Sequence, residues 1–479
     1  MSQRPPGTEP ILLENAVRLR PATAVDSGTC ERDVIARAEI RLLPKPGLAL
    51  IADDTPFRLD SAKEPWTLVQ PKTSGELFDV TPQPSPSSPP EDKLRQFFEI
   101  FEATGHETVS RQSTADAREP TRWNLVFLPR RAPIVVERRR EAAKRLELEI
   151  LNFPVFGGDA TKAVQLPGGI YRIGHLAVEA APWKIEFTER PGLGSVRAEL
   201  NASRGFATTH EARIDRADGG PIEKEEAQRL LEALDRFLSF TRGVGCATAV
   251  VRAFSGDDAV VWEQWGCRQV APWRPEPDSW FDLEHGRVLA EAFSAFLRTW
   301  ETCHEKRAAL REAIYWYLTG HWENSRVDGG LILLQAAMER LAHTFYRPKR
   351  WKGKERETSG QWLRMALERA GIPVEAPASF KALGTFADGL SCPKGEKRDA
   401  VFAMTQARNN AVHPRKETEV AGSLYFQAWT LARSFVELMV LSAIGYQGPF
   451  ANRLREGRVE LVPWAQTKKL QSAITHGAE

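Results

Sequence analysis

The stretch Arg408-Asn409-Asn410-Ala411-Val412-His413 closes a strongly periodic segment and decides how the C-terminal part of the chain folds. Apolar residues at positions 401, 404, 411 and 412 follow the three- and four-residue spacing of one helical face, which predicts a helix over residues 396–413. Arg408 falls on that face, where a guanidinium is costly unless it is paired or placed at a cleft. Pro414 disfavours helical backbone at His413, so we expect the helix to end there.

An arginine and a histidine at one helix end have two interpretations. A fixed cation and an imidazole that titrates near neutral pH suit chemistry on a phosphodiester. The same two residues can simply complement the negative end of the helix dipole. The neighbouring helices bear on the choice, because the stretch lies between two long helical segments with apolar stripes.

Helical periodicity dominates the chain after the proline-rich residues 272–277. Helices are predicted over residues 288–318, 329–346, 361–370, 378–390, 396–413 and 419–445. Consecutive helices with short connections predict an all-α helical bundle over residues 286–450. Residues 451–479 are interpreted as a C-terminal tail.

The first 280 residues have the pattern of β structure instead. Short β-rich runs bounded by turn residues predict strands over residues 34–43, 48–53, 124–128, 146–153, 171–179, 183–188, 247–254 and 259–265. This pattern is typical of a mostly antiparallel sheet or sandwich. Two helices are predicted within it, a short one at 91–103 and an amphipathic one at 221–240. The Pro/Ser-rich connector at residues 81–90 leaves open whether the region is one domain or two. We therefore expect a multidomain α+β protein.

The closing stretch and its place among the helices resemble the HEPN superfamily, whose hallmark is an arginine, a polar residue, a short spacer and a histidine. Here these residues are Arg408, Asn409 and His413. A large N-terminal region before such a domain is similar to the ApeA-type antiphage defence proteins. The resemblance implies a HEPN-like bundle that works as a homodimeric, metal-independent endoribonuclease, often a toxin or an antiviral (abortive infection) effector. It also implies a supporting acidic residue on an earlier helix, here Glu339.

The implied reaction uses the substrate's own ribose 2′-hydroxyl as nucleophile, so that neither a metal nor a cofactor is expected. His413 would act as general acid or base, Arg408 would stabilise the phosphoryl oxygens, and Asn409 would position the substrate or the histidine. The region 1–280 would sense a trigger and regulate cleavage. The alternative is a non-catalytic HEPN-type module that binds RNA or dimerises, with Arg408 as a structural pair. Glu339 has an alternative as well, an i, i+4 surface partner such as His343.

A basic segment follows the Glu339 helix. Residues 346–356 contain six cations and two aromatic residues. Cations neutralise phosphates and an aromatic ring can stack on a base, so the segment is a candidate RNA-binding loop. The assigned contacts are Lys349, Arg350, Trp351, Lys352 and Lys354. A solvated connector between helices is the alternative, and an exposed face is the favoured interpretation of the second basic cluster, at residues 130–140.

The amino-acid composition narrows the classes of partner, cellular setting and metal site that remain. The net charge of +2 does not by itself indicate a polyanion partner. The five cysteines are scattered without a CxxC pair, which argues against a disulfide framework or a structural zinc site and favours a reducing, cytoplasmic setting. No signal peptide is evident at the N-terminus. Arg433 and Glu437 interrupt the most apolar window, so no membrane span is predicted.

Other catalytic patterns are missing from the sequence, namely HExxH, GxSxG, a Walker phosphate loop, and GxGxxG after a strand. His304 and His321 lack a second ligand pair with metal-binding spacing, so packing or surface roles are expected for both. The glycines at 192 and 194 are predicted to form a turn.

Overall fold

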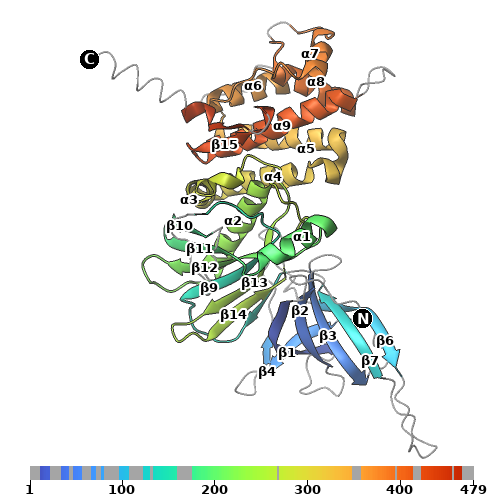
Figure 1. Cartoon of the computed structure of the whole chain (residues 1–479), viewed down its shortest axis with the longest axis vertical. Coiled ribbons are helices and arrows are strands. Elements are labelled where there is room, and N and C mark those ends of the chain that lie inside the picture. Colours follow the sequence, from blue (N-terminus) through green and yellow to red (C-terminus); the bar gives the residue numbers. More distant parts are fainter. Residues whose placement is uncertain are drawn as a thin grey trace, which may run out of the picture. The chain divides into compact units, whose positions relative to one another are not determined.

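The structure is a computed structural model. It describes the backbone of strands at 11–21, 34–41, 47–56, 66–71, 77–79, 97–106 and 122–129, and then residues 133–158, 175–266, 269–347, 358–393, 396–413, 422–455 and 458–465. A β-sheet region is followed by a helical region, as the predicted α+β class requires (Figure 1). The chain forms two compact units, one of residues 1–153, 189–227 and 247–274, the other of residues 154–188, 228–246 and 275–479. These units cross the boundary predicted near residue 280. The predicted connector at 81–90 lies outside the described residues.

The first sheet of unit one is antiparallel and has the strand order β1-β2-β3-β7-β6-β4-β5, with β1 also paired to β4. Its strands are β1 (Ile11–Pro21), β2 (Val34–Arg41), β3 (Gly47–Pro56), β4 (Trp66–Pro71), β5 (Leu77–Asp79), β6 (Phe97–His106) and β7 (Arg122–Pro129). The helix predicted at 91–103 is therefore wrong over residues 97–103. Aromatic residues favour a pleated strand, and cross-strand pairing with β7 outweighs the helical spacing of the apolar residues.

The second sheet contributes five antiparallel strands to unit one in the order β12-β9-β13-β14-β8. They are β8 (Ile134–Glu137), β9 (Arg145–Leu151), β12 (Thr208–Arg216), β13 (Ala247–Phe254) and β14 (Val260–Trp265). In β9, Leu146, Leu148 and Ile150 are buried, because alternate side chains of a strand point to one face. The turn predicted at 192–194 is present at Gly192, which has a left-handed backbone (φ 82°), but helix α1 (Leu193–Ser203) begins at the next residue and includes Gly194.

Unit two begins with a hairpin of β10 (Leu176–Ala180) and β11 (Trp183–Glu189). Helix α2 (Lys224–Arg242) confirms the amphipathic helix predicted at 221–240. Its Phe237 packs against Phe293 and Phe296, with ring centroids 5.2 and 5.5 Å apart. This contact joins α2 to the first helix of the helical region, α3 (Val288–Thr302).

The helical region continues with α4 (His304–Thr319), α5 (Trp322–Phe345), α6 (Ser359–Ala370), α7 (Lys381–Asp388), α8 (Ala400–Val412) and α9 (Gly422–Ala443). The single helix predicted at 288–318 is wrong, because Cys303 is extended (φ −162°, ψ 161°) and separates α3 from α4. The guanidinium of Arg307 donates to the Trp300 carbonyl at 3.1 Å, which satisfies an oxygen that the break leaves free. Arg326 (φ 57°, ψ 178°) similarly interrupts α5, close to the start predicted at 329.

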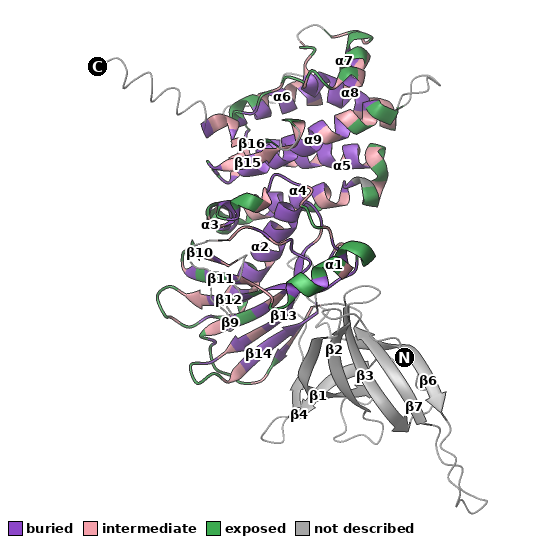
Figure 2. Ribbon diagram, viewed as in Figure 1, coloured by how far each residue is buried: buried purple, intermediate pink, exposed green. Residues whose placement is uncertain are grey.

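Helix α9 lies in the core of this region and is mostly buried (Figure 2). Helices α4 and α5 approach each other closely at two glycines. A Cβ added to Gly330 would lie 2.4 Å from the Gly320 carbonyl oxygen and 2.9 Å from Trp429 Nε1. Only glycine therefore fits at position 330. Of the helices whose residues are described, none combines the length and apolar character that crossing a membrane requires.

The predicted C-terminal tail contains ordered structure next to α9. Strand β15 (Pro449–Asn452) pairs with β16 (Arg458–Leu461), and a short 3-10 turn, η5 (Arg453–Arg455), lies between them. The Ala451 amide donates to the Trp280 carbonyl at 2.7 Å. The helical region therefore extends past the boundary expected at residue 450.

Candidate functional site

The helix predicted over residues 396–413 is present as α8, and it begins at Ala400. The carboxylate of Asp399 caps α8 by accepting from the Phe402 amide at 3.0 Å, and Arg364 of α6 pairs with the same carboxylate. The start of α8 is therefore fixed. At the other end, the His413 amide donates to the Asn409 carbonyl at 2.8 Å, and His413 leaves helical geometry.

Burial along α8 changes from its start to its end. Val401 and Met404 are buried, Arg408 is half-buried, and Val412 and His413 are exposed. The predicted apolar stripe is thus buried only in its first half. The last turn of α8 places the guanidinium partly in the protein and the imidazole in solvent, both within one and a half turns of helix.

The side chains of the last turn contact one another and α9. Arg408 Nη1 donates to Asn409 Oδ1 at 3.3 Å, and Asn410 Nδ2 donates to the Tyr425 hydroxyl at 3.0 Å. The Nε of Arg408 is buried without a hydrogen-bond partner. Within the described part of the chain, Arg408 forms no ion pair.

The predicted supporting residue, Glu339, is half-buried on α5. Its carboxylate accepts from Gln335 Nε2 at 2.8 Å, and the same amide nitrogen lies 3.4 Å from Ser359 Oγ on α6. Gln335 and Thr405 are both 3% exposed, and each has a buried oxygen without a hydrogen-bond partner. The contact described for Glu339 is thus to Gln335, one helical turn away, and no described contact joins it to Arg408.

The five assigned RNA contacts at residues 349–354 lie outside the described residues, as do Arg130 and Arg131. In the rest of that second basic cluster, Arg138 pairs with Glu263 at 2.9 Å and Arg139 lies 3.4 Å from Asp257. Two of its cations are therefore neutralised within the protein.

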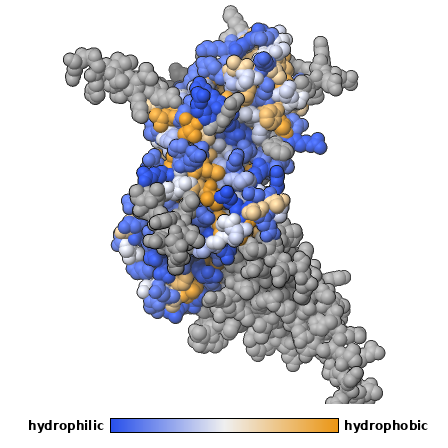
Figure 3. Space-filling view, in the orientation of Figure 1, coloured by the Kyte–Doolittle hydropathy of each residue, from blue (hydrophilic) through white to orange (hydrophobic). Residues whose placement is uncertain are grey.

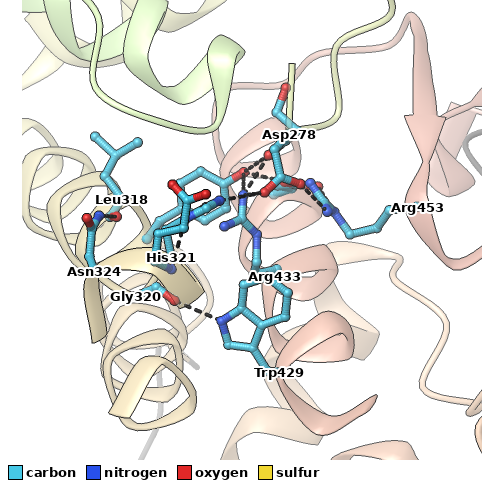
Figure 4. Close-up of polar contacts among 12 residues, drawn as sticks. Asp278, Leu318, Gly320, His321, Asn324, Trp429, Arg433 and Arg453 are labelled. Atoms are coloured by element: carbon cyan, nitrogen blue, oxygen red, sulfur yellow. Dashed lines mark hydrogen bonds and ion pairs between the residues drawn. The ribbon is translucent and has the colours of Figure 1, made fainter. Parts of the chain in front are cut away.

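A second polar constellation, which the sequence analysis missed, centres on Asp278 (Figure 4). One carboxylate oxygen of Asp278 lies 2.8 Å from His321 Nε2, and the other accepts from Arg453 Nη1 at 3.0 Å. Arg433 of α9 donates to the Asp278 carbonyl at 2.6 Å and lies 3.6 Å from its carboxylate. Asp278, which precedes α3 in the sequence, therefore contacts residues at the start of α5, in α9 and in η5.

A second carboxylate, that of Glu437, binds Arg453 directly and is linked to Arg433 through Tyr317. Arg453 makes two hydrogen bonds to Glu437, of 2.7 and 3.1 Å, which is the bidentate geometry preferred by a guanidinium. The Tyr317 hydroxyl accepts from Arg433 at 3.0 Å and donates to Glu437. Two carboxylates thus balance two guanidiniums. We name Asp278, His321, Tyr317, Arg433, Glu437 and Arg453 the Asp278 network.

The ionisation of the Asp278 network follows from its burial. Burial by itself raises the pKa of Asp278, but Arg433, the hydrogen bond from His321, and Arg453 outweigh it and hold that pKa well below its usual range. Burial also raises the pKa of the Tyr317 hydroxyl. His321 Nδ1 accepts from the Glu323 amide at 3.3 Å, and its Nε2 lies 2.8 Å from the Asp278 carboxylate. The two carboxylates of the network therefore match its two guanidiniums in charge, and the imidazole is held against one of the carboxylates.

A cavity of about 460 Å³ opens beside Asp278 and Arg453. Glu276, Asp282 and Glu284 are among its other lining residues. Asp278 is 29% exposed at its side chain, whereas Arg433 is fully buried and Glu437 nearly so. Solvent can thus reach one edge of the network. Across the described residues, no group of three or more His, Cys, Asp or Glu side chains is arranged to hold a metal ion.

The signal for this network was present in the sequence but incomplete. Arg433 and Glu437 are spaced four apart in an apolar helix, which predicts that both share one buried face. Their partners are distant, since Asp278 precedes Arg433 by 155 residues. His321, for which a packing or surface role was expected, is buried and bonded to Asp278. Only the fold brings these groups together.

The visible face of the molecule shows hydrophobic side chains in small separate groups among hydrophilic ones (Figure 3). Exposed large hydrophobic residues among those described are Tyr315, Val412 and Phe426. Val412 adjoins His413 at the end of α8, and Phe426 lies in the first turns of α9. Apolar surface is therefore available close to the α8 end.

Comparison with known proteins gives two matches along the chain. Residues 138–276 match the family described as "YopA central domain", and residues 304–462 match "YopA C-terminal domain". The "SPbeta prophage-derived uncharacterized protein YopA" of Bacillus subtilis (strain 168) is 23% identical over 337 residues, which cover 67% of this chain and 72% of the relative. No solved structure matches. None of these matches names the HEPN superfamily. The chain is similar to YopA in both its central and its C-terminal part.

Proposed function

We propose that this chain is a metal-independent endoribonuclease of the HEPN type, with its active site at the C-terminal end of α8. The observation that carries the proposal is the placement of Arg408 and His413. Arg408 is half-buried without a described ion pair, and the exposed His413 follows it by five residues at the same helix end. This pair supplies a phosphate-binding cation and a proton carrier at one place.

The proposed reaction follows from the chemistry of these side chains. The ribose 2′-oxygen attacks the adjacent phosphorus while His413 takes or gives the proton, and the bond to the 5′-oxygen of the next nucleotide breaks. Arg408 stabilises the negative charge on the phosphoryl oxygens, and Asn409 holds Arg408 or the substrate in place. The products are a 2′,3′-cyclic phosphate and a 5′-hydroxyl. Uncontrolled cleavage of cellular RNA is toxic, which fits a toxin or antiviral effector regulated by its own N-terminal region.

Purified full-length protein is expected to cleave single-stranded RNA in the presence of a chelator and to leave 2′,3′-cyclic phosphate ends. Gel analysis with end-group chemistry measures both the cleavage and the ends. DNA of the same sequence should remain intact, because it lacks the attacking 2′-hydroxyl. RNA that stays intact at every protein concentration, or fragments that end in a 3′-hydroxyl, would contradict the proposal.

A second candidate function is a non-catalytic module that binds RNA or forms a homodimer. It is favoured by the contacts of Arg408 with Asn409 and of Asn410 with Tyr425, which give the α8 end a structural role. The two candidates share the expectation of a homodimer. Only the first predicts cleavage, so the RNA assay separates them.

The basic segment at 349–354 is proposed to guide RNA in either case. Replacing Lys349, Arg350, Lys352 and Lys354 with serine should weaken RNA binding and flatten its salt dependence, because each neutralised phosphate releases a counterion. Trp351→Ala should weaken single-stranded binding more than duplex binding, since only unpaired bases can stack on it. Filter binding across a salt series measures both effects. Unchanged affinity of the four-serine variant at every salt concentration would end this assignment.

A further inference from the structure

One face of α9 connects the α8 end to the Asp278 network. Tyr425, Trp429, Arg433 and Glu437 follow one another at four-residue spacing, which makes each the neighbour of the next along a slowly winding face of the helix. Tyr425 accepts the hydrogen bond of Asn410 at 3.0 Å. At the far end, Glu437 binds Arg453. The face therefore begins at the proposed active site and ends in the buried network.

The middle of this face is held rigidly. Trp429 Nε1 donates to the Gly320 carbonyl at 2.8 Å, and the guanidinium of Arg433 lies 5.1 Å from the Trp429 ring centroid. The same guanidinium also lies 4.6 Å from the centroid of the Tyr317 ring. A fully buried Arg433 that contacts two rings has little freedom to adjust alone. We expect movement of Arg433 to displace Trp429, because the two side chains are in contact.

The other end of the network lies in the sequence that joins the two matched segments, 138–276 and 304–462. Asp278 belongs to this connector. Its amide donates to the Arg242 carbonyl at 3.0 Å, and Ser279 Oγ donates to the Thr241 carbonyl of α2. A Cβ at Gly243 would lie 1.9 Å from the Asp278 carbonyl oxygen, so the connector and the end of α2 are in backbone contact. Asp278 is held from both sides.

We propose that residues 276–282 form a latch whose release alters the last turn of α8 through the Tyr425–Trp429–Arg433–Glu437 face. With Asp278 in place, Asp278 and Glu437 balance Arg433 and Arg453. When Asp278 withdraws, Glu437 remains as the one carboxylate of the network for the fully buried Arg433 and the half-buried Arg453, which is a costly state that forces Arg433 to rearrange. The cavity beside Asp278 and Arg453 gives room for this withdrawal at the exposed edge of the network. Regulation of RNA cleavage by the latch rests on the proposed function. The structural coupling between the latch and the last turn of α8 does not depend on that function.

Hydrogen–deuterium exchange of full-length protein tests the coupling without any substrate. Asp278→Asn should raise amide exchange in residues 276–282 and in the last turn of α8, residues 409–413, by about 5- to 150-fold. Because coupling is reciprocal, Tyr425→Phe should raise exchange in residues 276–282 as well, although it removes one hydroxyl at the opposite end. The double variant should show less than the sum of the two effects.

Glu312→Gln serves as the matched control. It removes the carboxylate that Arg340 binds at 2.6 Å between α4 and α5, outside the proposed face, and should leave residues 409–413 unchanged. The latch is refuted if neither Asp278→Asn nor Tyr425→Phe affects the opposite end. It is also refuted if Tyr425→Phe raises exchange equally in the α5 core, residues 334–341, since that variant is not expected to destabilise the helical region as a whole.

The RNA assay supplies a separate arm. If wild-type protein cleaves RNA, Asp278→Asn should change the cleavage rate while the control Glu312→Gln does not, and equal rates for all three would exclude regulation by the latch. If wild-type protein cleaves no RNA, the proposed function fails, and the exchange result still decides the structural coupling.

Discussion

Replacing His413 with alanine is expected to lower the rate of RNA cleavage by about 10²–10⁴-fold, the usual contribution of a general acid–base group. The imidazole is exposed beyond the last turn of α8, so its removal deletes a proton carrier without opening a cavity. RNA binding should change little, because Arg408 and the basic segment remain. Single-turnover cleavage and equilibrium binding, measured on the same RNA, separate the two effects.

His304→Ala is the matched control for this prediction. His304 is an exposed histidine at the start of α4 and should be dispensable for cleavage. Arg408→Ala should also lower cleavage, through the loss of phosphate stabilisation, and Arg408→Lys should restore only part of it, because lysine lacks the planar fork of arginine. If His413→Ala cleaves as fast as wild type, the catalytic assignment of the α8 end is wrong.

Replacing Asp278 with asparagine is expected to lower the free energy of unfolding of the helical region by about 3 kcal/mol, the low end of the range for breaking a buried ion pair. The low end applies because the Asp278 side chain keeps 29% exposure. Arg433 and Arg453 would then share Glu437 as their remaining carboxylate in the network. Urea unfolding, followed by circular dichroism, measures the loss.

A second substitution should recover part of that stability. Arg453→Gln combined with Asp278→Asn leaves Arg433 and Glu437 as a balanced pair, so the double variant should be more stable than the sum of the single changes implies. A strictly additive double variant would show that charge balance does not hold this network together.

The pH dependence of the Asp278 contribution has a definite sign. Its pKa in the folded protein lies below that of the unfolded chain, so folding is favoured by the ionised carboxylate. The stability contributed by the ionised Asp278 carboxylate should therefore be fully present above the unfolded pKa of about 4. It should shrink only as the pH falls below about 4, through the unfolded and then the folded pKa.

The sequence predicted elements well where local pattern and tertiary pairing agree. Strand β13 has the bounds that its apolar run and flanking glycines indicate, and α8 ends at the residue that Pro414 requires. Helix α1 escaped notice because Gly192 and Gly194 indicate a turn. Its stripe of three buried residues is modest. Phe97 and Phe98 show the opposite case, in which helical spacing is overruled by strand partners.

The residues of the candidate site likewise differ in how far the sequence alone reveals them. The Arg408 and His413 pair can be found in the sequence because six consecutive residues contain it. The Asp278 network cannot, since a buried guanidinium such as Arg433 is understandable only once its distant carboxylates are known. Interpreting Arg433 and Glu437 only as interruptions of an apolar window hid the pairing of Glu437 with Arg453 and of Arg433 with Asp278.

The contact of Gly330 with Gly320 and Trp429 has a consequence for tracing distant relatives. At this crossing the backbone of one helix takes the volume that any side chain would need, and the indole of Trp429 closes the remaining side. A glycine aligned with Gly330, together with a hydrogen-bonding aromatic residue aligned with Trp429, is therefore a paired marker of this helix crossing. Such a marker can identify chains that keep the architecture after most of their sequence similarity has been lost.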